Sequence, residues 1–323
     1  MIPPKLKKGD LVRIVSPSHS ISTISDDSIK LAVKNLEKLG LKVDFSANCF
    51  ELNCFESSSI KSRADDINNA FDDKKVKAIL CARGGFNSNQ LLPYLDYNSI
   101  KKNPKIFCGY SDITALNNGI FAKTGLFTYA GINFSTFRKS HCQDYNLEYF
   151  KKCLMSPDSY EVKPSKKYFE YLQKSAIKNK GYFVLREGES TGEIIGENLC
   201  TFNLLQGTDY MPDLKGKIIF LEEENISSKD TIYMFDRELA SLCQQRNFGK
   251  IKGLVIGRFQ KATGMTNEKL KEIIDSKKEL PKNIPVIAGL DFAHTIPRFT
   301  YPIGGTCKII AKKGRASLEI LKH

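Results

Sequence analysis

The chain has 323 residues, 41% of them hydrophobic, which is long and apolar enough for two domains with buried cores. No apolar run approaches the roughly 18 residues that a membrane helix needs. The formal net charge is +13, but the lysines are spread along the chain, often beside Asp or Glu, and no aromatic-basic RNA motif or DNA-reading helix is found. We therefore expect a solvated lysine-rich surface, with neither a nucleic acid nor a membrane as partner.

The nine cysteines are odd in number, scattered, and include no C-x-x-C pair. Cys49 and Cys54 have no neighbouring His or Cys to complete a zinc site. The N-terminus has lysines but no apolar stretch with a small-residue cleavage site, so we expect no signal peptide. These features predict a cytoplasmic protein with free thiols, no metal and no cofactor.

Strands alternate with helices through the first half of the chain, which predicts a doubly wound parallel sheet. We expect strands at 11–15, 41–45, 76–82 and 106–108, and helices at about 26–39, 59–71, between 86 and 106, and from 112 to the stop signal Gly125. Ligands of such sheets bind at the carboxyl ends of the strands. The turn after residue 82 and the turn after residue 108 both fall there.

The alternation weakens between about 160 and 186, where lysines are dense, and we expect a partly helical connection between domains. Beyond it we expect strands at 191–196, 217–221, 253–257 and 285–288, and helices at about 198–205 and 230–243. The predicted division is a nucleophile domain at 1–160, a connection at 161–189, and a smaller α/β or β-rich domain at 190–323.

Ser111 lies where the strand 106–108 turns into a helix. That geometry exposes the hydroxyl and leaves the Asp112 N–H free at a helix N-terminus, where it can bind an oxyanion. The nucleophile elbow of hydrolases has the pattern G-x-S-x-G, and here Ile113 replaces the final glycine. The alternative is that Ser111 or Asp112 only caps the helix.

A histidine and a group of carboxylates also follow strands. His294 comes after the strand 285–288, and Glu222, Glu223 and Glu224 end the strand 217–221. Serine, imidazole and carboxylate at strand ends are the parts of a nucleophilic hydrolase. The alternative for His294 is a structural histidine in a loop. The alternative for the three glutamates is a solvated run of charged residues.

Gly84 and Gly85 end the strand 76–82 and have two interpretations. They form a bare turn, or they bring a backbone N–H to a reacting carbonyl oxygen. A phosphate loop is disfavoured because neither G-x-x-x-x-G-K-[ST] nor G-x-G-x-x-G is present.

The chain resembles the serine LD-carboxypeptidase family over almost its whole length. The likeness lies in separate motifs that stand in the right order: VRIVSPSHSI at 12–21, RGGFNS at 83–88, GYSDITAL at 109–116, NLCTFNLLQGTDYMPDLKGKIIFLEEE at 198–224 and DFAHTIPRFTYPIGG at 291–305. The resemblance implies a catalytic triad with Ser111 as nucleophile, His294 as base and Glu222 as its carboxylate, Glu223 being the fallback if the register slips by one.

The same resemblance implies an oxyanion hole built from the Gly85 and Asp112 N–H groups, and a homodimer. The chain departs from the family pattern at three places. Asn87 replaces the last glycine of the usual R-G-G-Y-G, after Phe86 in place of tyrosine. Ala293 replaces the glycine of the usual F-G-H, and Glu197 replaces the second glycine of the usual G-G-N.

One branch of the family trims a terminal D-residue from muropeptides, and another resembles microcin-immunity carboxypeptidases, which cleave the amide between an acidic residue and a nucleotide-like group. Segments 133–137, 146–150 and 256–261 resemble the second branch more closely. We therefore expect a small peptidyl-nucleotide substrate first and a muropeptide second. Arg83, Arg138 and Arg298 are candidate partners for a substrate carboxylate, and Phe86 is a candidate pocket residue.

Two other functions remain open at this point. A non-catalytic small-molecule-binding module would not need Ser111, Glu222 and His294 to converge, and separations beyond about 8 Å would favour it. A general esterase of the α/β-hydrolase type fits the chain order Ser, Glu, His, but the missing elbow glycine and the two-domain pattern argue against it.

Overall fold

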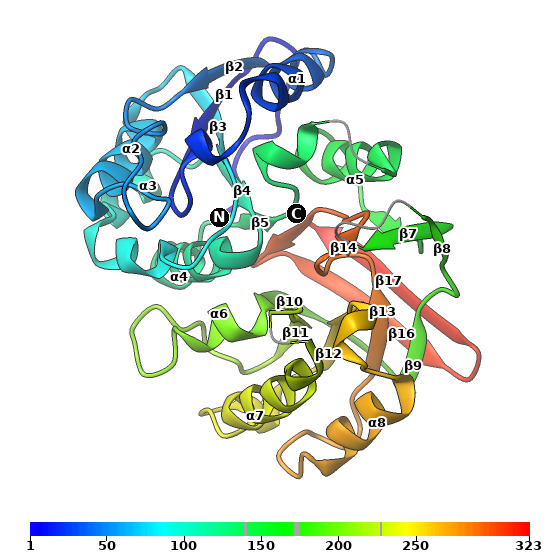
Figure 1. Cartoon of the computed structure of the whole chain (residues 1–323). Helices are drawn as coiled ribbons and strands as arrows, with labels where there is room; N and C mark the ends of the chain where they lie inside the picture. The colour runs from blue at the N-terminus through cyan, green and yellow to red at the C-terminus, as the bar shows by residue number, and fades with distance from the viewer. Residues whose placement is uncertain (139–140, 171–174, 227) are drawn as a thin grey trace.

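The computed structural model describes residues 1–138, 141–170, 175–226 and 228–323. The first half of the chain folds around a six-stranded sheet in the order β15-β5-β4-β3-β1-β2. Figure 1 labels its strands β1 to β5. Strands β1 to β5 are parallel, and β15 is antiparallel to β5. Their bounds are β1 Leu11–Val15, β2 Lys42–Phe45, β3 Val76–Cys81, β4 Ile106–Gly109, β5 Thr128–Ala130 and β15 Tyr301–Ile303.

Helices cover both faces of this sheet because its strands are apolar on both sides. Along β1, Ile14 packs with Leu36 of α1, whereas Val15 packs with Ile67 of α2 in a separate core. This arrangement confirms the predicted doubly wound sheet. The helices are α1 Asp26–Glu37, α2 Ile60–Asp72, α3 Tyr97–Lys102, α4 Thr114–Thr124 and α5 Gln143–Leu154.

The second sheet has eight strands in the order β6-β17-β16-β10-β11-β12-β13-β9. Its centre, β10 to β13, is parallel and its outer strands are antiparallel, which confirms a strand-rich α/β second domain. The strands are β6 Tyr160–Val162, β9 Phe183–Arg186, β10 Gly188–Asn198, β11 Lys217–Glu222, β12 Gly253–Gly257, β13 Val286–Leu290, β16 Thr306–Lys312 and β17 Arg315–Lys322, and the helices are α6 Leu199–Asn203, α7 Thr231–Cys243 and α8 Asn267–Ser276.

The expected helical connection at 160–186 is wrong within the described residues. The segment forms β6, β7 (Lys167–Glu170), β8 (Ile177–Lys178) and β9 instead, while residues 171–174 lie outside the described ranges. Three of these short strands take a partner far along the chain: β6 pairs with β17, β7 with β14 (Thr295–Ile296), and β9 with β13, whereas β8 pairs with the neighbouring β7. Distant pairing, rather than local periodicity, sets their structure.

The two sheets exchange strands. β6 leaves the first half to join the second sheet, and β15 returns from the second half to the edge of the first. One apolar core also contains residues of both sheets, among them Ile14 of β1 and Phe220 of β11. The carboxyl ends of β4, β11 and β13 therefore meet between two joined units. In the described ranges no helix is long and apolar enough to cross a membrane.

Candidate active site

The turn after β4 gives Ser111 an unusual backbone. Ser111 has a φ of +68°, a conformation that L-residues rarely adopt and that costs of the order of 1–3 kcal/mol. A Cβ on Gly109 would lie 2.9 Å from the side chains of both Cys81 and Ile113, so the turn needs glycine there. The Ser111 hydroxyl does not cap the helix but makes a hydrogen bond of 3.0 Å with His294 Nε2.

His294 and Glu222 form the rest of a hydrogen-bonded chain. His294 Nδ1 lies 2.7 Å from Glu222 Oε2, and the two side chains are 5% and 0% exposed. Glu222 is the last residue of β11, and His294 follows β13 two strands away in the same sheet. The structure thus brings together the three residues that the sequence singled out, from the carboxyl ends of three strands.

Asn198 holds the carboxylate in place. Its Nδ2 donates to Glu222 Oε1 at 3.0 Å, and its own Oδ1 accepts from Thr201 N at the start of α6. Burial opposes ionisation of Glu222, but the charge and hydrogen bond of His294 outweigh it, so the pKa of Glu222 is lowered. Glu222 is therefore ionised at neutral pH and fixes the proton on His294 Nδ1.

His294 is surrounded by acidic groups. Burial lowers the pKa of its imidazole, but the Glu222 carboxylate and the charge of Glu224 outweigh burial, and the net effect raises that pKa. Glu224 Oε2 lies 3.5 Å from Nε2 and lines the open side of the site. The sequence pattern does not single out Glu224 as a neighbour of the imidazole, because its distance from His294 depends on how the chain turns after β11.

The Gly84–Gly85 turn packs directly against the nucleophile. A Cβ on Gly84 would lie 3.1 Å from Ser111 Oγ, and a Cβ on Gly85 would lie 2.3 Å from Ser18 Oγ. A side chain at Gly85 would clash with its neighbours and one at Gly84 would crowd Ser111, so the backbone of the turn lies close beside the nucleophile. This close approach supports the oxyanion interpretation of the turn over a bare reversal.

The Asp112 carboxylate anchors that turn, which the sequence did not reveal. It accepts hydrogen bonds from Asn87 N at 2.9 Å, Ser88 N at 2.8 Å and the Ser18 hydroxyl. Asp112 thus presents its backbone beside Ser111 while its side chain holds the glycine turn. The only sequence signal was the position of Asp112 directly after the serine.

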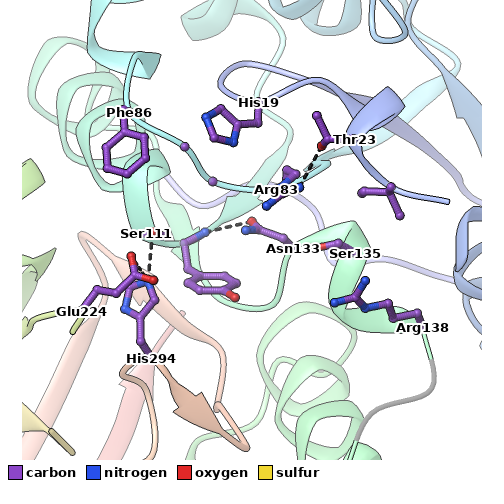
Figure 2. A pocket seen from close by; sticks show the side chains of 14 residues that line it. His19, Thr23, Arg83, Phe86, Ser111, Asn133, Ser135, Arg138, Glu224 and His294 are labelled. Carbon is purple, nitrogen blue, oxygen red and sulfur yellow. Dashed lines mark hydrogen bonds and ion pairs between the residues drawn. The ribbon is translucent and has the colours of Figure 1, made fainter. Parts of the chain in front are cut away.

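A cavity of about 240 Å³ opens above Ser111 (Figure 2). Its lining includes the cations Arg83 and Arg138, and Arg83 Nη1 donates to Thr23 Oγ1 at 2.8 Å. The Phe86 ring is 71% exposed at the rim and tilts against His19. Burial, followed by the charge of Arg83, lowers the pKa of His19.

Arg298 has a different environment from the other two arginines. It is 4% exposed, and its two terminal nitrogens donate to Glu197 Oε1 and to the Ala293 carbonyl. Its guanidinium also stacks on the Tyr110 ring, 3.7 Å from the ring centre. Because the side chain is buried and both terminal nitrogens already have acceptors, we assign Arg298 to the scaffold of the site rather than to its binding surface.

Two departures from the family pattern are accommodated locally. The Asn87 side chain turns to Arg63, whose Nη1 donates to Asn87 Oδ1 at 3.0 Å. Ala293 is fully buried, and a Cβ on Gly257 would lie 2.7 Å from the Ala293 Cβ, so glycine at 257 leaves room for alanine at 293. Among the described residues, no group of three or more His, Cys, Asp or Glu side chains could hold a metal ion.

Family models and curated relatives match this chain over most of its length. Models of the LD-carboxypeptidase N-terminal and C-terminal domains match residues 12–131 and 191–309. YocD of Bacillus subtilis, named as a carboxypeptidase, is 48% identical, and the match covers 99% of each chain. The microcin C7 self-immunity protein MccF of Escherichia coli is 32% identical over 93% of this chain and 90% of its own length.

Solved structures of MccF and of an MccF-like protein share the fold of this chain. An MccF-like protein from Bacillus anthracis superimposes with a TM-score of 0.98 at 51% identity over the full length of both chains. MccF in complex with aspartyl sulfamoyl adenosine superimposes with a TM-score of 0.88 at 29% identity, covering 100% of this chain and 99% of that one. By sequence and by fold, the chain belongs to the LD-carboxypeptidase family.

Proposed function

We propose that this protein is a serine carboxypeptidase in which Ser111, His294 and Glu222 act as nucleophile, base and orienting carboxylate. The observation that carries the proposal is the unbroken hydrogen-bonded chain, 3.0 Å from Ser111 to His294 and 2.7 Å from His294 to Glu222. These distances argue against a binding-only module, which has no need of such convergence. The two strand-exchanging sheets argue against the general esterase, which has a single sheet.

The geometry supports an acyl-transfer mechanism. Ser111 Oγ attacks the amide carbonyl as its proton passes to His294 Nε2, and Glu222 stabilises the imidazolium. The backbone N–H groups of Gly85 and Asp112 receive the oxyanion. His294 then gives the proton to the leaving nitrogen, and water, activated by the same imidazole, releases the acyl group from Ser111.

We propose a peptidyl- or aminoacyl-nucleotide of the sulfamoyl-adenylate type as substrate. Support comes from the pocket, where Arg83 and Arg138 offer two cations for anionic groups and Phe86 offers an exposed ring. It also comes from the MccF structures, one of which holds aspartyl sulfamoyl adenosine. The second candidate is a muropeptide, favoured by a 28% identical Bacillus subtilis relative named for murein peptide carboxypeptidase activity.

Mass spectrometry of the purified protein with each substrate tests these proposals. Aspartyl sulfamoyl adenosine should be cleaved at its aminoacyl bond, and an LD-tetrapeptide should be cleaved more slowly. Preferential cleavage of the tetrapeptide would replace the first substrate class by the second. Cleavage of neither would contradict the carboxypeptidase itself. A homodimer and a cytoplasmic location remain predictions from the family resemblance and the cysteine content.

The acidic surroundings of His294 predict the pH dependence. The imidazole is a base only when unprotonated, and its ordinary pKa is about 6.5. The net effect of burial, Glu222 and Glu224 raises the pKa of His294 above that ordinary value. Activity should therefore be lost as the pH falls through this raised pKa, because the imidazole then becomes protonated. We expect kcat/KM to rise with pH through one ionisation displaced upward from about 6.5. An inflection below that value in a pH-rate profile would contradict this assignment of the base.

The two pocket arginines predict a binding effect. Arg83→Met should raise KM for an anionic substrate by roughly 10-fold or more, because a hydrogen bond to a charged group contributes about 1.5–3 kcal/mol. The Arg138→Met variant measures how much the second cation contributes to binding of the same anionic substrate. Steady-state kinetics should show kcat changing less than KM. Arg315→Met, at the exposed start of β17, is the control; an equal rise in KM there would point to a general loss of surface charge.

A further inference from the structure

A buried ion pair lies behind the reacting groups and outside the triad. Glu197, near the end of β10, is fully buried, and its Oε1 accepts from Arg298 Nη2 at 2.7 Å. Burial raises the pKa of Glu197 to about 8, because the Arg298 guanidinium opposes that rise only in part. Nothing in the proposed mechanism uses either side chain, yet burying a pair of this kind costs both side chains their hydration.

One end of the pair holds the nucleophile turn. Glu197 Oε2 accepts from Thr114 Oγ1 at 2.7 Å, and Thr114 is the first residue of α4, the helix that follows Ser111. Arg298 stacks on the ring of Tyr110, the residue before Ser111. The pair therefore contacts the chain on both sides of the nucleophile.

The other end holds the histidine loop. Arg298 Nη1 donates to the carbonyl of Ala293, whose neighbour is His294. The Tyr110 ring also lies against His294, with 5.7 Å between ring centres. A single guanidinium thus contacts the residue before Ser111 and the residue before His294.

Glu197 occupies its position against its backbone preference. Its φ is +137°, in the region that glycine adopts readily and other residues rarely adopt. A glutamate held in this conformation, with both carboxylate oxygens bonded, indicates that its side chain contributes something that glycine cannot.

The hydrogen bond between Ser111 and His294 needs support from other side chains, because it joins residues that follow strands of two different sheets. Glu222 ends β11, and His294 lies in the loop that follows β13, so nearby strands of the second sheet bring these two residues together. Ser111 follows β4 of the other sheet, and its hydrogen bond with His294 crosses between the two units.

We propose that Glu197 and Arg298 form a positioning pair that fixes Ser111 Oγ within hydrogen-bond distance of His294 Nε2. The inference rests on the proposed triad. The pair acts through Thr114, Tyr110 and Ala293 and touches neither the substrate nor the reacting atoms.

The decisive variant is the double substitution Glu197→Gly with Arg298→Met. Glycine suits the backbone at 197, and methionine keeps apolar volume over Tyr110, so the midpoint of thermal unfolding should stay near the wild-type value. Activity is measured on whichever of aspartyl sulfamoyl adenosine and the LD-tetrapeptide the wild type cleaves. We expect kcat to fall at least 10-fold with KM within about twofold, as when an interaction of the transition state is lost.

Two further measurements separate positioning from general stability. Glu197→Gln keeps an acceptor for Arg298 and a partner for Thr114, and should restore kcat to within about threefold of wild type. The downfield proton resonance of the His294–Glu222 hydrogen bond should persist in every variant, because the pairing of β14 with β7 still holds the loop that carries His294, and Asn198 still holds the Glu222 carboxylate. The control, Arg13→Met with Asp44→Leu, removes an ion pair within the first sheet and should leave kcat unchanged.

Each contrary result has a distinct meaning. Wild-type kcat in the double variant, with Ser111→Ala inactive, would overturn the positioning pair and leave the triad standing. Loss of the downfield resonance together with a fall in the unfolding midpoint would assign the pair to the fold alone and also overturn the proposal. Turnover by Ser111→Ala would instead overturn the proposed function.

Discussion

Replacing Ser111 with alanine is expected to lower kcat by roughly four orders of magnitude or more, as triad knockouts do. Alanine removes the hydroxyl oxygen that lies 3.0 Å from His294 Nε2, so no covalent intermediate can form. The backbone strain at φ +68° is the same for serine and alanine, and the fold should stay intact. Comparison of kcat and of thermal unfolding for the two proteins measures both effects.

Ser228 supplies a matched control for that substitution. It too has a positive φ, of +50°, but it is exposed and lies away from the cavity lining. Ser228→Ala should therefore leave kcat within about twofold of wild type. Near-normal turnover in Ser111→Ala would remove Ser111 from the role of nucleophile.

Glu222→Gln should cost about 10³–10⁴ in kcat, by analogy with the Asp-to-Asn change in a serine protease triad. The carboxylate accepts the Nδ1 proton of His294, leaving Nε2 free to take the proton of Ser111. A glutamine amide can donate to Nδ1 instead, which moves the ring proton to Nε2 and blocks the base. Asn198 still bonds the remaining oxygen, so the fold should be retained.

The neighbouring Glu223→Gln is the matched control, and it should cost less than about 10-fold. Glu223 faces away from the imidazole, accepting from Cys200 N at 3.1 Å and from Asn198 Nδ2 at 3.3 Å. Burial, followed by the charges of Glu222 and Glu238, raises the pKa of Glu223 to about 8, so a neutral amide resembles its state near neutral pH. If Glu223→Gln were the crippling change, the carboxylate would be misassigned by one residue. If neither mattered, the triad would lack its third member.

The sequence predicted those parts of the site that local pattern determines. A strand followed directly by Ser111, and strands followed by Glu222 and His294, place polar side chains at carboxyl ends whatever the partners are. The first sheet was predictable for the same reason, since its strands and helices alternate along the chain. The strands between 160 and 186 were not, because β6 pairs near Leu318 and β9 near Ile287, more than 100 residues away.

The supporting contacts were hidden for a related reason. Arg298 was considered for a substrate carboxylate by its charge alone, but its partner Glu197 lies 101 residues earlier in the chain. Glu197 was noticed only as a departure from a glycine pattern, since neither its positive φ nor its burial can be read from the residue type. The Asp112 side chain likewise gained its role from residues 18, 87 and 88.

The return of β15 to the first sheet bears on how the protein is made. Until Tyr301–Ile303 leaves the ribosome, β5 has no partner on one side and the first sheet has an open, adhesive edge. His294 is synthesised just before that strand. The nucleophile unit is therefore sealed and supplied with its base in the same short interval of translation, so a nascent chain that stops earlier has neither a closed sheet nor a working hydrolase.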